Sequence, residues 1–348
     1  MEHLFWLAVA TVVIVLFFDY TNGFHDAANI VATIIASRAM TPAQAVVVVG
    51  VFEFLGPLLG GTAVANTIGK FVDLSSLDAQ LSMLILFCGL LGAIVWNLLT
   101  WWFGIPSSSS HALVGGLAGA VVAAVGSEYV IWGWTPLMHE GKLLGVMKVL
   151  VSLFVSPVLG FVVGFLIFRI GRRVMANAKP TANATLRKLQ FLTAACLAFS
   201  HGANDAQKSM GMLTLVLLLG GFIPKFEVPF WVIVACATAI TLGILSGGWR
   251  IVRTLGFAIY RVRPLHAFSS QLTSGLLILS ASYLGAPVST THVVATSIMG
   301  IGYSEHPRAV RWKKAVDIAK TWVITIPASA LTSIVCYALA RVMLGHTN

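Results

Sequence analysis

Two short segments that lie far apart in the chain share one pattern. Residues 104–111 read GIPSSSSH, and residues 285–292 read GAPVSTTH. In both, Gly and Pro precede hydroxyl residues that end at a His, and the two histidines lie 181 positions apart. A second pair, residues 22–29 (NGFHDAAN) and residues 201–208 (HGANDAQK), aligns its Gly and Asp at an offset of 179. Two unrelated motifs in the same order and at nearly the same offset indicate an internal duplication.

The duplication divides the chain into two halves. We predict a first membrane repeat over residues 1–168 and a second over residues 189–348. The joining segment, residues 169–188, holds six Lys or Arg residues and no acid. Short basic loops stay on the cytoplasmic side of a membrane protein, so we expect this linker in the cytoplasm. Basic residues recur over 250–263 and 308–320, and these segments should face the same side.

The composition is that of a membrane protein. The 348 residues are 58% hydrophobic and only 10% charged, with a mean hydropathy of +0.90, whereas a soluble domain carries about 25% charged residues. So few charges do not cover a water-facing surface, which excludes most soluble enzymes. The formal net charge of +10 comes from short clusters between apolar runs. Such clusters orient membrane proteins, so we expect a lipid bilayer as partner and no nucleic acid.

These observations together predict the fold class. We expect an all-α polytopic membrane protein built from two inverted-topology repeats, whose broken or half helices meet at a central site, as in many secondary transporters. With the linker in the cytoplasm, both termini should lie outside. The alternative is a parallel repeat in which one loop is assigned to the wrong side.

The two segments with Pro and hydroxyl residues interrupt apolar runs and resemble the starts of half-helices within the membrane. Pro is favoured in the first turn of a helix, and a helix N-terminus offers free N–H groups and a partial positive charge. Two such ends that face each other would hold a tetrahedral oxyanion. Alternatively, the hydroxyls only satisfy the backbone of a Pro-kinked helix. The predicted anion ligands are Ser107, Ser108, Ser109, Ser110, Ser289, Thr290 and Thr291.

Two aspartates occupy equivalent places in the halves. Asp26 and Asp205 lie in apolar surroundings, each three residues after a Gly, so we expect each to mark a helix break or the start of a half-helix. Ionisable groups within a membrane are costly and usually functional. A carboxylate there either caps helix N–H groups or binds a cation. Because inverted repeats bring such pairs together near the membrane midplane, we favour cation binding.

Other ionisable residues near these motifs are weaker candidates. His25 and Lys208 lie within one turn of an aspartate, where they either balance its charge or couple protons. His111 and His292 end the hydroxyl runs, and they either contact the anion or are hydrogen-bonded core residues. Glu53 lies between two phenylalanines, where it either handles ions or pairs with a buried Lys or His.

These motifs resemble those of the inorganic phosphate transporter (Pit) family, and the resemblance covers nearly the whole chain. The family carries the signature GANDVAN followed by Ala or Ser once per half. Here residues 202–205 read GAND, whereas residues 23–29 read GFHDAAN. The combination of NGFHD with SHGANDAQK is similar to the bacterial low-affinity branch. The resemblance implies a multi-pass protein of the bacterial inner membrane that carries inorganic phosphate and forms a homodimer.

The resemblance also implies a symporter driven by a cation gradient. Family members use Na⁺, H⁺, or H⁺ with a metal–phosphate complex, and a few are reported to carry sulfate. In sodium-coupled relatives the signature Asp and Asn residues bind Na⁺. The matching residues here are Asp26, Asn29, Asn204 and Asp205.

Two departures from the signature bear on the coupling ion. Lys208 and His25 stand where the signature has Asn, and a Lys ammonium could replace one bound cation. We therefore favour H⁺ or a metal–phosphate complex over Na⁺, and we expect no resident cofactor and no certain metal site. A sulfate permease and a passive anion channel are the alternatives. A membrane enzyme is not expected, because Ser110 and His111 are adjacent and point about 100° apart on a helix.

Overall fold

The computed structural model describes residues 2–247, 251–252 and 254–343. Within these residues the secondary structure is helical, apart from one isolated antiparallel bridge between Val72 and Val130. The predicted all-α class is therefore confirmed. Arg250 and Arg253, which belong to the second basic segment, lie outside the described residues.

The helices follow the same order in the two halves. The first half contains α1 (Glu2–Ser37), α2 (Pro42–Leu59), α3 (Ala63–Gly69), α4 (Ala79–Trp102), α5 (Ser109–Ala124), the 3₁₀ turn η1 (Ser127–Tyr129), α6 (Trp134–Glu140) and α7 (Gly145–Val174). The second half contains α8 (Ala182–Leu219), α9 (Phe230–Ser246), the π-helical turn η2 (Thr254–Ala258), α11 (Pro264–Tyr283), α12 (Thr290–Glu305), the 3₁₀ turn η3 (Pro307–Ala309) and α13 (Trp312–Met343). Thus α1, α2, α4 and α5 match α8, α9, α11 and α12 in order.

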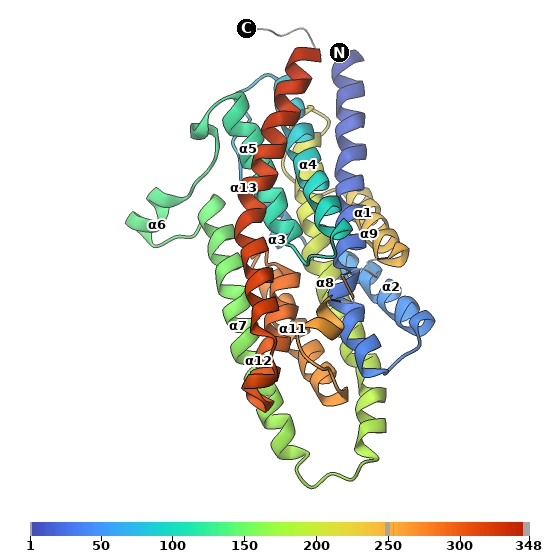
Figure 1. The fold of residues 1–348 in the computed structure, drawn as a ribbon. Coiled ribbons are helices and arrows are strands. Elements are labelled where there is room, and N and C mark those ends of the chain that lie inside the picture. Colours follow the sequence, from blue (N-terminus) through green and yellow to red (C-terminus); the bar gives the residue numbers. More distant parts are fainter. Residues whose placement is uncertain (1, 248–250, 253, 344–348) are drawn as a thin grey trace.

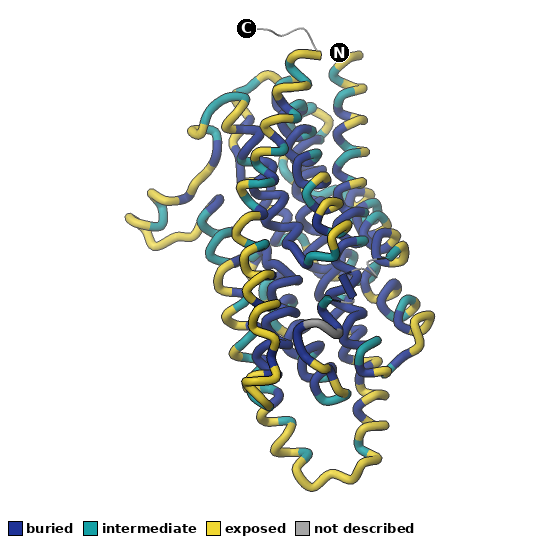
Figure 2. The backbone as a smooth tube through the Cα atoms, viewed as in Figure 1, coloured by how far each residue is buried: buried dark blue, intermediate teal, exposed yellow. Residues whose placement is uncertain are grey.

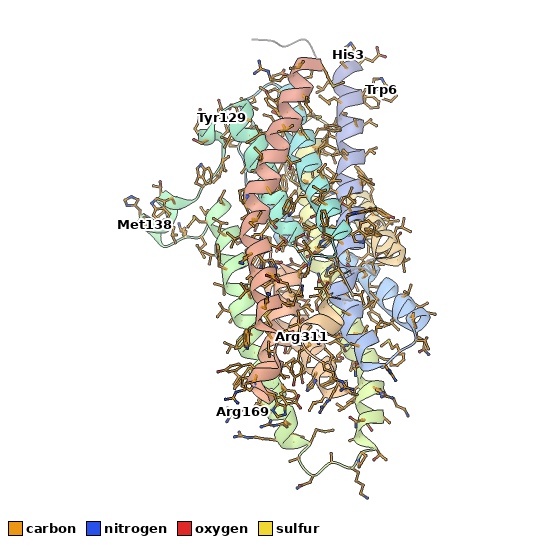
Figure 3. The ribbon with its side chains drawn as sticks, in the orientation of Figure 1. His3, Trp6, Tyr129, Met138, Arg169 and Arg311 are labelled. Atoms are coloured by element: carbon orange, nitrogen blue, oxygen red, sulfur yellow. The ribbon has the colours of Figure 1, made fainter. Side chains whose placement is uncertain are left out.

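The matching helices α1 and α8 run in opposite directions. In Figure 1, α1 runs from the end that carries the N-terminus towards the far end, where α7 joins α8, and α8 runs back. The first turn of α1 and the last turn of α13 lie at the same end of the molecule. In Figure 3, Arg169 and Arg311 lie towards the opposite end from His3 and Trp6. Only residues 175–181 of the predicted linker are outside helices. The relation of the halves by inversion across a membrane stays a prediction.

The long apolar helices are those of an integral membrane protein. By length and composition α1, α2, α4, α7 and α13 could each cross a membrane. The outer faces of α7 and α13 are largely exposed in Figure 2, and the exposed side chains there are large and apolar. Examples are Phe154 and Val158 on α7, and Val323 and Leu331 on α13. An apolar surface of this kind suits lipid rather than water.

The apolar core is divided into two clusters with a polar layer between them. On α1, residues up to Phe18 belong to one cluster and residues from Ala27 onward belong to the other. On α8 the division falls between Ala198 and Ala206. The residues between these limits include both signature aspartates. The two longest helices therefore carry their polar residues to the level at which the two clusters meet.

Candidate functional site

The helices α5 and α12 begin at the hydroxyl runs. Their first residues are Ser109 and Thr290, and their N-caps are Ser108 and Ser289. Each cap hydroxyl accepts a hydrogen bond from the backbone N–H three residues later, at 3.2 and 3.3 Å. The chain thus starts a new helix at each run, after α4 and α11 have ended, and does not continue through a kink. This is the half-helix arrangement expected from the sequence.

The place of the prolines differs from the expectation. Pro106 and Pro287 lie before the N-caps and not in the first turn of either helix. The side-chain caps already satisfy one of the free N–H groups of each helix. Pro instead holds an extended chain between the preceding turn and the cap, because its ring fixes φ.

The carboxylate of Asp26 lies where the two helix N-termini converge. It accepts hydrogen bonds from the hydroxyls of Ser109 at 3.4 Å, Thr290 at 3.2 Å and Thr291 at 3.3 Å. His25 Nδ1 lies 2.8 Å from Asp26 Oδ1, the oxygen that also accepts from Thr291. Asp26 is 1% exposed. A buried anion is therefore held by hydroxyls that come from the first turns of both half-helices.

Asp205 is paired with a buried lysine. Lys208 Nζ lies 2.7 Å from Asp205 Oδ1 and also donates to the Ser110 hydroxyl at 2.6 Å and the Val288 carbonyl at 3.1 Å. The Lys208 side chain is 1% exposed. Asn22 Nδ2 donates to the other Asp205 oxygen at 3.4 Å. The ammonium group thus links α8 to the residues at the start of both half-helices.

His201 lies between the two aspartates. Its Nε2 is 3.6 Å from Asp205 Oδ2 and 3.9 Å from Asp26 Oδ2, and its Nδ1 is 2.7 Å from Glu53 Oε1. All four groups are buried. Burying charges is costly unless they are paired, and this imidazole is placed to offset the charge of the surrounding carboxylates.

His201 is a site residue that the sequence reasoning missed. It opens the second motif and precedes Asp205 by four residues, a spacing that puts both on one face of a helix. That spacing was a usable signal. The pairing of Glu53 with a buried His agrees with one of the two interpretations that the sequence left open for it.

Of the remaining predicted residues, Asn29 and Ser107 contact residues of the central site, whereas Asn204 does not. Asn29 belongs to the centre, because its Nδ2 donates to Thr291 at 2.9 Å and to Thr290 at 3.5 Å. Ser107 bonds Thr100 at 2.7 Å and lies 3.2 Å from His25 Nε2, behind Asp26. Asn204 points elsewhere, with hydrogen bonds to the Ser282 hydroxyl at 3.1 Å and the Ala286 carbonyl at 3.2 Å.

The two histidines that end the hydroxyl runs lie in contact, with their ring planes tilted by 54°. The ring centroids of His111 and His292 are 4.7 Å apart, and His292 also lies 3.8 Å from the Trp322 ring. Both are buried. Their rings thus pack the two half-helices together, with α13 behind them.

The expected helix breaks at the aspartates do not occur. α1 and α8 are continuous through Asp26 and Asp205. The glycines before them serve close packing instead. A Cβ on Gly23 would lie 2.1 Å from the Ile240 carbonyl oxygen, and one on Gly202 would lie 2.3 Å from that of Glu53. A glycine in a helix interior permits such an approach of two backbones.

The centre has donors for a cation. One ligand atom from each of Asp26, His201 and Asp205 lies within 4.8 Å of the others. Carboxylates suit Na⁺-like hard cations and protons, while the imidazole suits transition metals. Lys208 already neutralises one of the aspartates at 2.7 Å. The donor set therefore fits a proton or one cation better than several metal ions.

Comparison with known proteins identifies the family. The family model described as the phosphate transporter family matches residues 22–333. The chain belongs to the phosphate transporter family. It is 41% identical over 339 residues to a probable low-affinity inorganic phosphate transporter of Rhizobium meliloti, covering 97% of each chain. It is 38% identical over 346 residues to one of Bacillus subtilis, covering 99% of this chain and 100% of the relative.

A solved structure has the same fold. The protein described as the sodium-dependent phosphate transporter matches with a TM-score of 0.83 and 24% identity, over 97% of this chain and 99% of that one. The matches to the Rhizobium meliloti and Bacillus subtilis proteins confirm the predicted resemblance to bacterial low-affinity phosphate transporters. This phosphate transporter family member is an integral membrane protein whose relatives are transporters and not enzymes.

Proposed function

We propose that the chain is a cation-coupled symporter that carries inorganic phosphate across the bacterial inner membrane. One observation carries the proposal: the Asp26 carboxylate accepts hydrogen bonds from Ser109, Thr290 and Thr291, at the N-termini of two half-helices. Hydroxyls and N–H groups at a helix N-terminus form an anion site. Phosphate needs the same donors that Asp26 occupies.

The competition between Asp26 and phosphate gives a physical reason for coupling. Two unit charges about 4 Å apart repel by about 4 kcal/mol at an effective dielectric constant of about 20. A cation or proton on Asp26 removes this repulsion and weakens its hold on the hydroxyls. The freed donors then bind phosphate. Each ligand thus favours the other, which is the thermodynamic condition for symport.

Lys208 supplies a positive charge beside the second aspartate, Asp205. Its ammonium contacts Ser110 and the Val288 carbonyl as well as Asp205, so it lies beside the start of both half-helices. Phosphate at the centre would gain a favourable charge there without a second metal ion. For this reason we favour H⁺, or H⁺ with a metal–phosphate complex, over two or more Na⁺ ions.

The remaining parts of the proposal concern orientation and assembly. We place residues 169–188 in the cytoplasm and both termini outside, because the basic segments gather towards one end. The exposed apolar faces leave room for a homodimer within the bilayer. Movement of the helices around a fixed centre would then open it to each side in turn.

Uptake by the purified protein in liposomes tests the proposal. Labelled phosphate should accumulate above equilibrium when an inward H⁺ gradient is imposed, with Na⁺, divalent metals and sulfate varied separately. Stimulation by Na⁺ alone would show that Na⁺, and not H⁺, is the coupling ion. Preferred uptake of sulfate would show that sulfate, and not phosphate, is the substrate. Equilibration without accumulation under every gradient would show a passive channel.

A further inference from the structure

A further carboxyl group is buried on α1, outside the site described above. Asp19 is 0% exposed, and neither of its carboxylate oxygens has a hydrogen-bond partner among the described residues. Buried ionisable groups are normally paired, because an isolated charge in a medium of low dielectric is costly. An unpaired acid within a membrane marks an ion or proton pathway.

Asp19 lies between the central site and the end of the molecule that carries the termini. It precedes Asp26 by seven residues on one continuous helix, which is nearly two turns and about 10 Å along the axis. The Ser209 hydroxyl of α8 and the Cys236 thiol of α9 lie beside it. The Ser209 hydroxyl likewise has no hydrogen-bond partner in the described part of the chain.

Polar side chains connect Asp19 to the centre. Ser209 follows Asp205 by four residues on α8, so both lie on one helix face. Asn22 follows Asp19 by three residues and donates to Asp205 at 3.4 Å. The charged groups that act on Asp19 from the neighbouring helices are Asp205 and Lys208 of α8 and Glu53 of α2. Asp205 is paired with Lys208, and Glu53 is paired with His201. No cation in the described part of the chain therefore pairs with Asp19.

A proton fits this place better than a metal ion. The unpartnered atoms of Asp19, Asn22 and Ser209 are all oxygens. The carboxylate and amide oxygens only accept hydrogen bonds, so they need a hydrogen or a cation to bind, whereas the Ser209 hydroxyl carries a hydrogen of its own. A hard metal cation takes about six oxygen ligands. Among the described residues, carboxylate and imidazole ligands come together around Asp26 and not around Asp19. A proton needs only the carboxyl group and one acceptor.

We propose that Asp19 is a proton-binding site whose occupancy is linked to phosphate binding at the centre. The inference rests on the proposed phosphate symport. Asp19 takes a proton from water on the side of the termini, forming an O–H bond that replaces its charge. The loss of one negative charge about 10 Å from the centre strengthens phosphate binding on the order of tenfold. The O–H bond breaks again, and the proton returns to water, after phosphate leaves.

Proton uptake during phosphate binding tests this inference. The purified wild type and Asp19→Asn receive phosphate in weakly buffered solution with a pH indicator. Phosphate itself titrates near neutral pH, but this contribution is common to both proteins. Because a tenfold linkage changes the proton occupancy of one site by at most about half a proton, the wild type should take up as much as about half a proton more per bound phosphate than Asp19→Asn. Its phosphate affinity should fall as the pH rises, while that of Asp19→Asn should change about tenfold less. Equal proton uptake and equal pH profiles would overturn the inference.

Matched variants separate the outcomes. Asp317→Asn removes an exposed acid on α13 and should behave as the wild type. If Asp19→Asn does not fold, infrared spectra of the wild type and of Asp19→Glu test the same inference. Phosphate binding to the wild type should increase the absorption band of a protonated carboxyl group. The frequency of this band should be shifted in Asp19→Glu. An unshifted band overturns the inference, as does a dependence on Na⁺ at constant pH that Asp19→Asn abolishes. A wild type that binds no phosphate would instead refute the proposed function.

Discussion

At the scale of single residues, Lys208 is a lysine whose side chain is almost fully buried. It is one of the largest fully buried side chains, and its ammonium donates to a carboxylate, a hydroxyl and a carbonyl. Buried lysines are rare unless they are paired. Removing one partner of a buried ion pair is strongly destabilising, because the other charge remains. Lys208 therefore determines how much negative charge the centre presents to a cation.

Replacing Lys208 tests this role. Lys208→Asn restores the Asn of the family signature and supplies an oxygen ligand beside Asp205. We expect phosphate uptake that has become dependent on Na⁺, because a bound cation must replace the lost ammonium. Lys208→Met is the matched control, since it removes the charge without adding an oxygen ligand. It should lose uptake in every cation. Uptake is measured over a range of Na⁺ concentrations at fixed pH. If phosphate uptake by Lys208→Asn depends on Na⁺ no more than uptake by the wild type does, Lys208 is only a structural counter-ion of Asp205.

The hydroxyls at the two half-helices give a second prediction at this scale. Ser109→Ala and Thr290→Ala each remove a donor to Asp26. Each should weaken phosphate binding by about 1–3 kcal/mol, the contribution of a hydrogen bond to a charged group. The exposed Ser280, whose hydroxyl bonds its own helix, provides the control Ser280→Ala. Binding measured by calorimetry should be unchanged in the control. Normal affinity in the double variant would remove these segments from the site.

At the scale of elements, close contacts between helix backbones position the site. Gly202 lets α8 approach α2 at Glu53, and Gly23 lets α1 approach α9 at Ile240. The same residues stand beside the ionisable groups of the centre. Packing and chemistry are thus encoded within a few residues of each other, and a small displacement of α8 moves His201 and Asp205 together.

Adding one methyl group tests this packing. Gly202→Ala places a Cβ 2.3 Å from the Glu53 carbonyl oxygen. Overpacking of this kind should destabilise the protein by about 1–3 kcal/mol and weaken phosphate binding. In Gly275→Ala the new Cβ meets its neighbours at 3.5 Å, an ordinary contact, so this control should be neutral or stabilising. Thermal unfolding in detergent compares the two. Equal stability of both variants would contradict the close contact of α2 and α8.

The elements also show what the sequence could reveal. The hydroxyl runs predicted the half-helices, because Ser and Thr are strong N-caps and the preceding Pro interrupts the chain. The helix breaks predicted from Gly23 and Gly202 were wrong, because a glycine occurs both at helix breaks and where two helix backbones lie in close contact. Which one applies depends on a partner helix that local sequence does not specify. The convergence of Asp26, His201 and Lys208 is likewise a tertiary result from α1 and α8, which lie far apart in the sequence.

At the scale of the whole molecule, positive charge gathers on one side. A cavity of about 840 Å³ is lined by five arginines, Arg38, Arg187, Arg261, Arg263 and Arg311. These residues come from both halves of the chain. Figure 3 places Arg169 and Arg311 towards the end opposite to His3. Basic residues accumulate on the cytoplasmic side of membrane proteins, so this end should face the cytoplasm.

Labelling from outside intact cells tests this orientation. A single cysteine at residue 179, introduced by Lys179→Cys into a chain whose four native cysteines are replaced by Ser or Ala, should resist a membrane-impermeant reagent until the cells are opened. His139→Cys, on the connection towards the end with the termini, should react at once. Reaction of residue 179 in intact cells would contradict the proposed topology and the inverted arrangement derived from it.

We propose above all that the two signature aspartates, Asp26 and Asp205, couple a cation to phosphate movement. The most direct measurement is accumulation of labelled phosphate by liposomes that contain the wild type, Asp26→Asn or Asp205→Asn under an imposed cation gradient. The wild type should concentrate phosphate above equilibrium. Both variants should still exchange phosphate across the membrane but should not concentrate it, because no charge remains to recruit the coupling ion. Accumulation by both variants at the wild-type level would contradict the account.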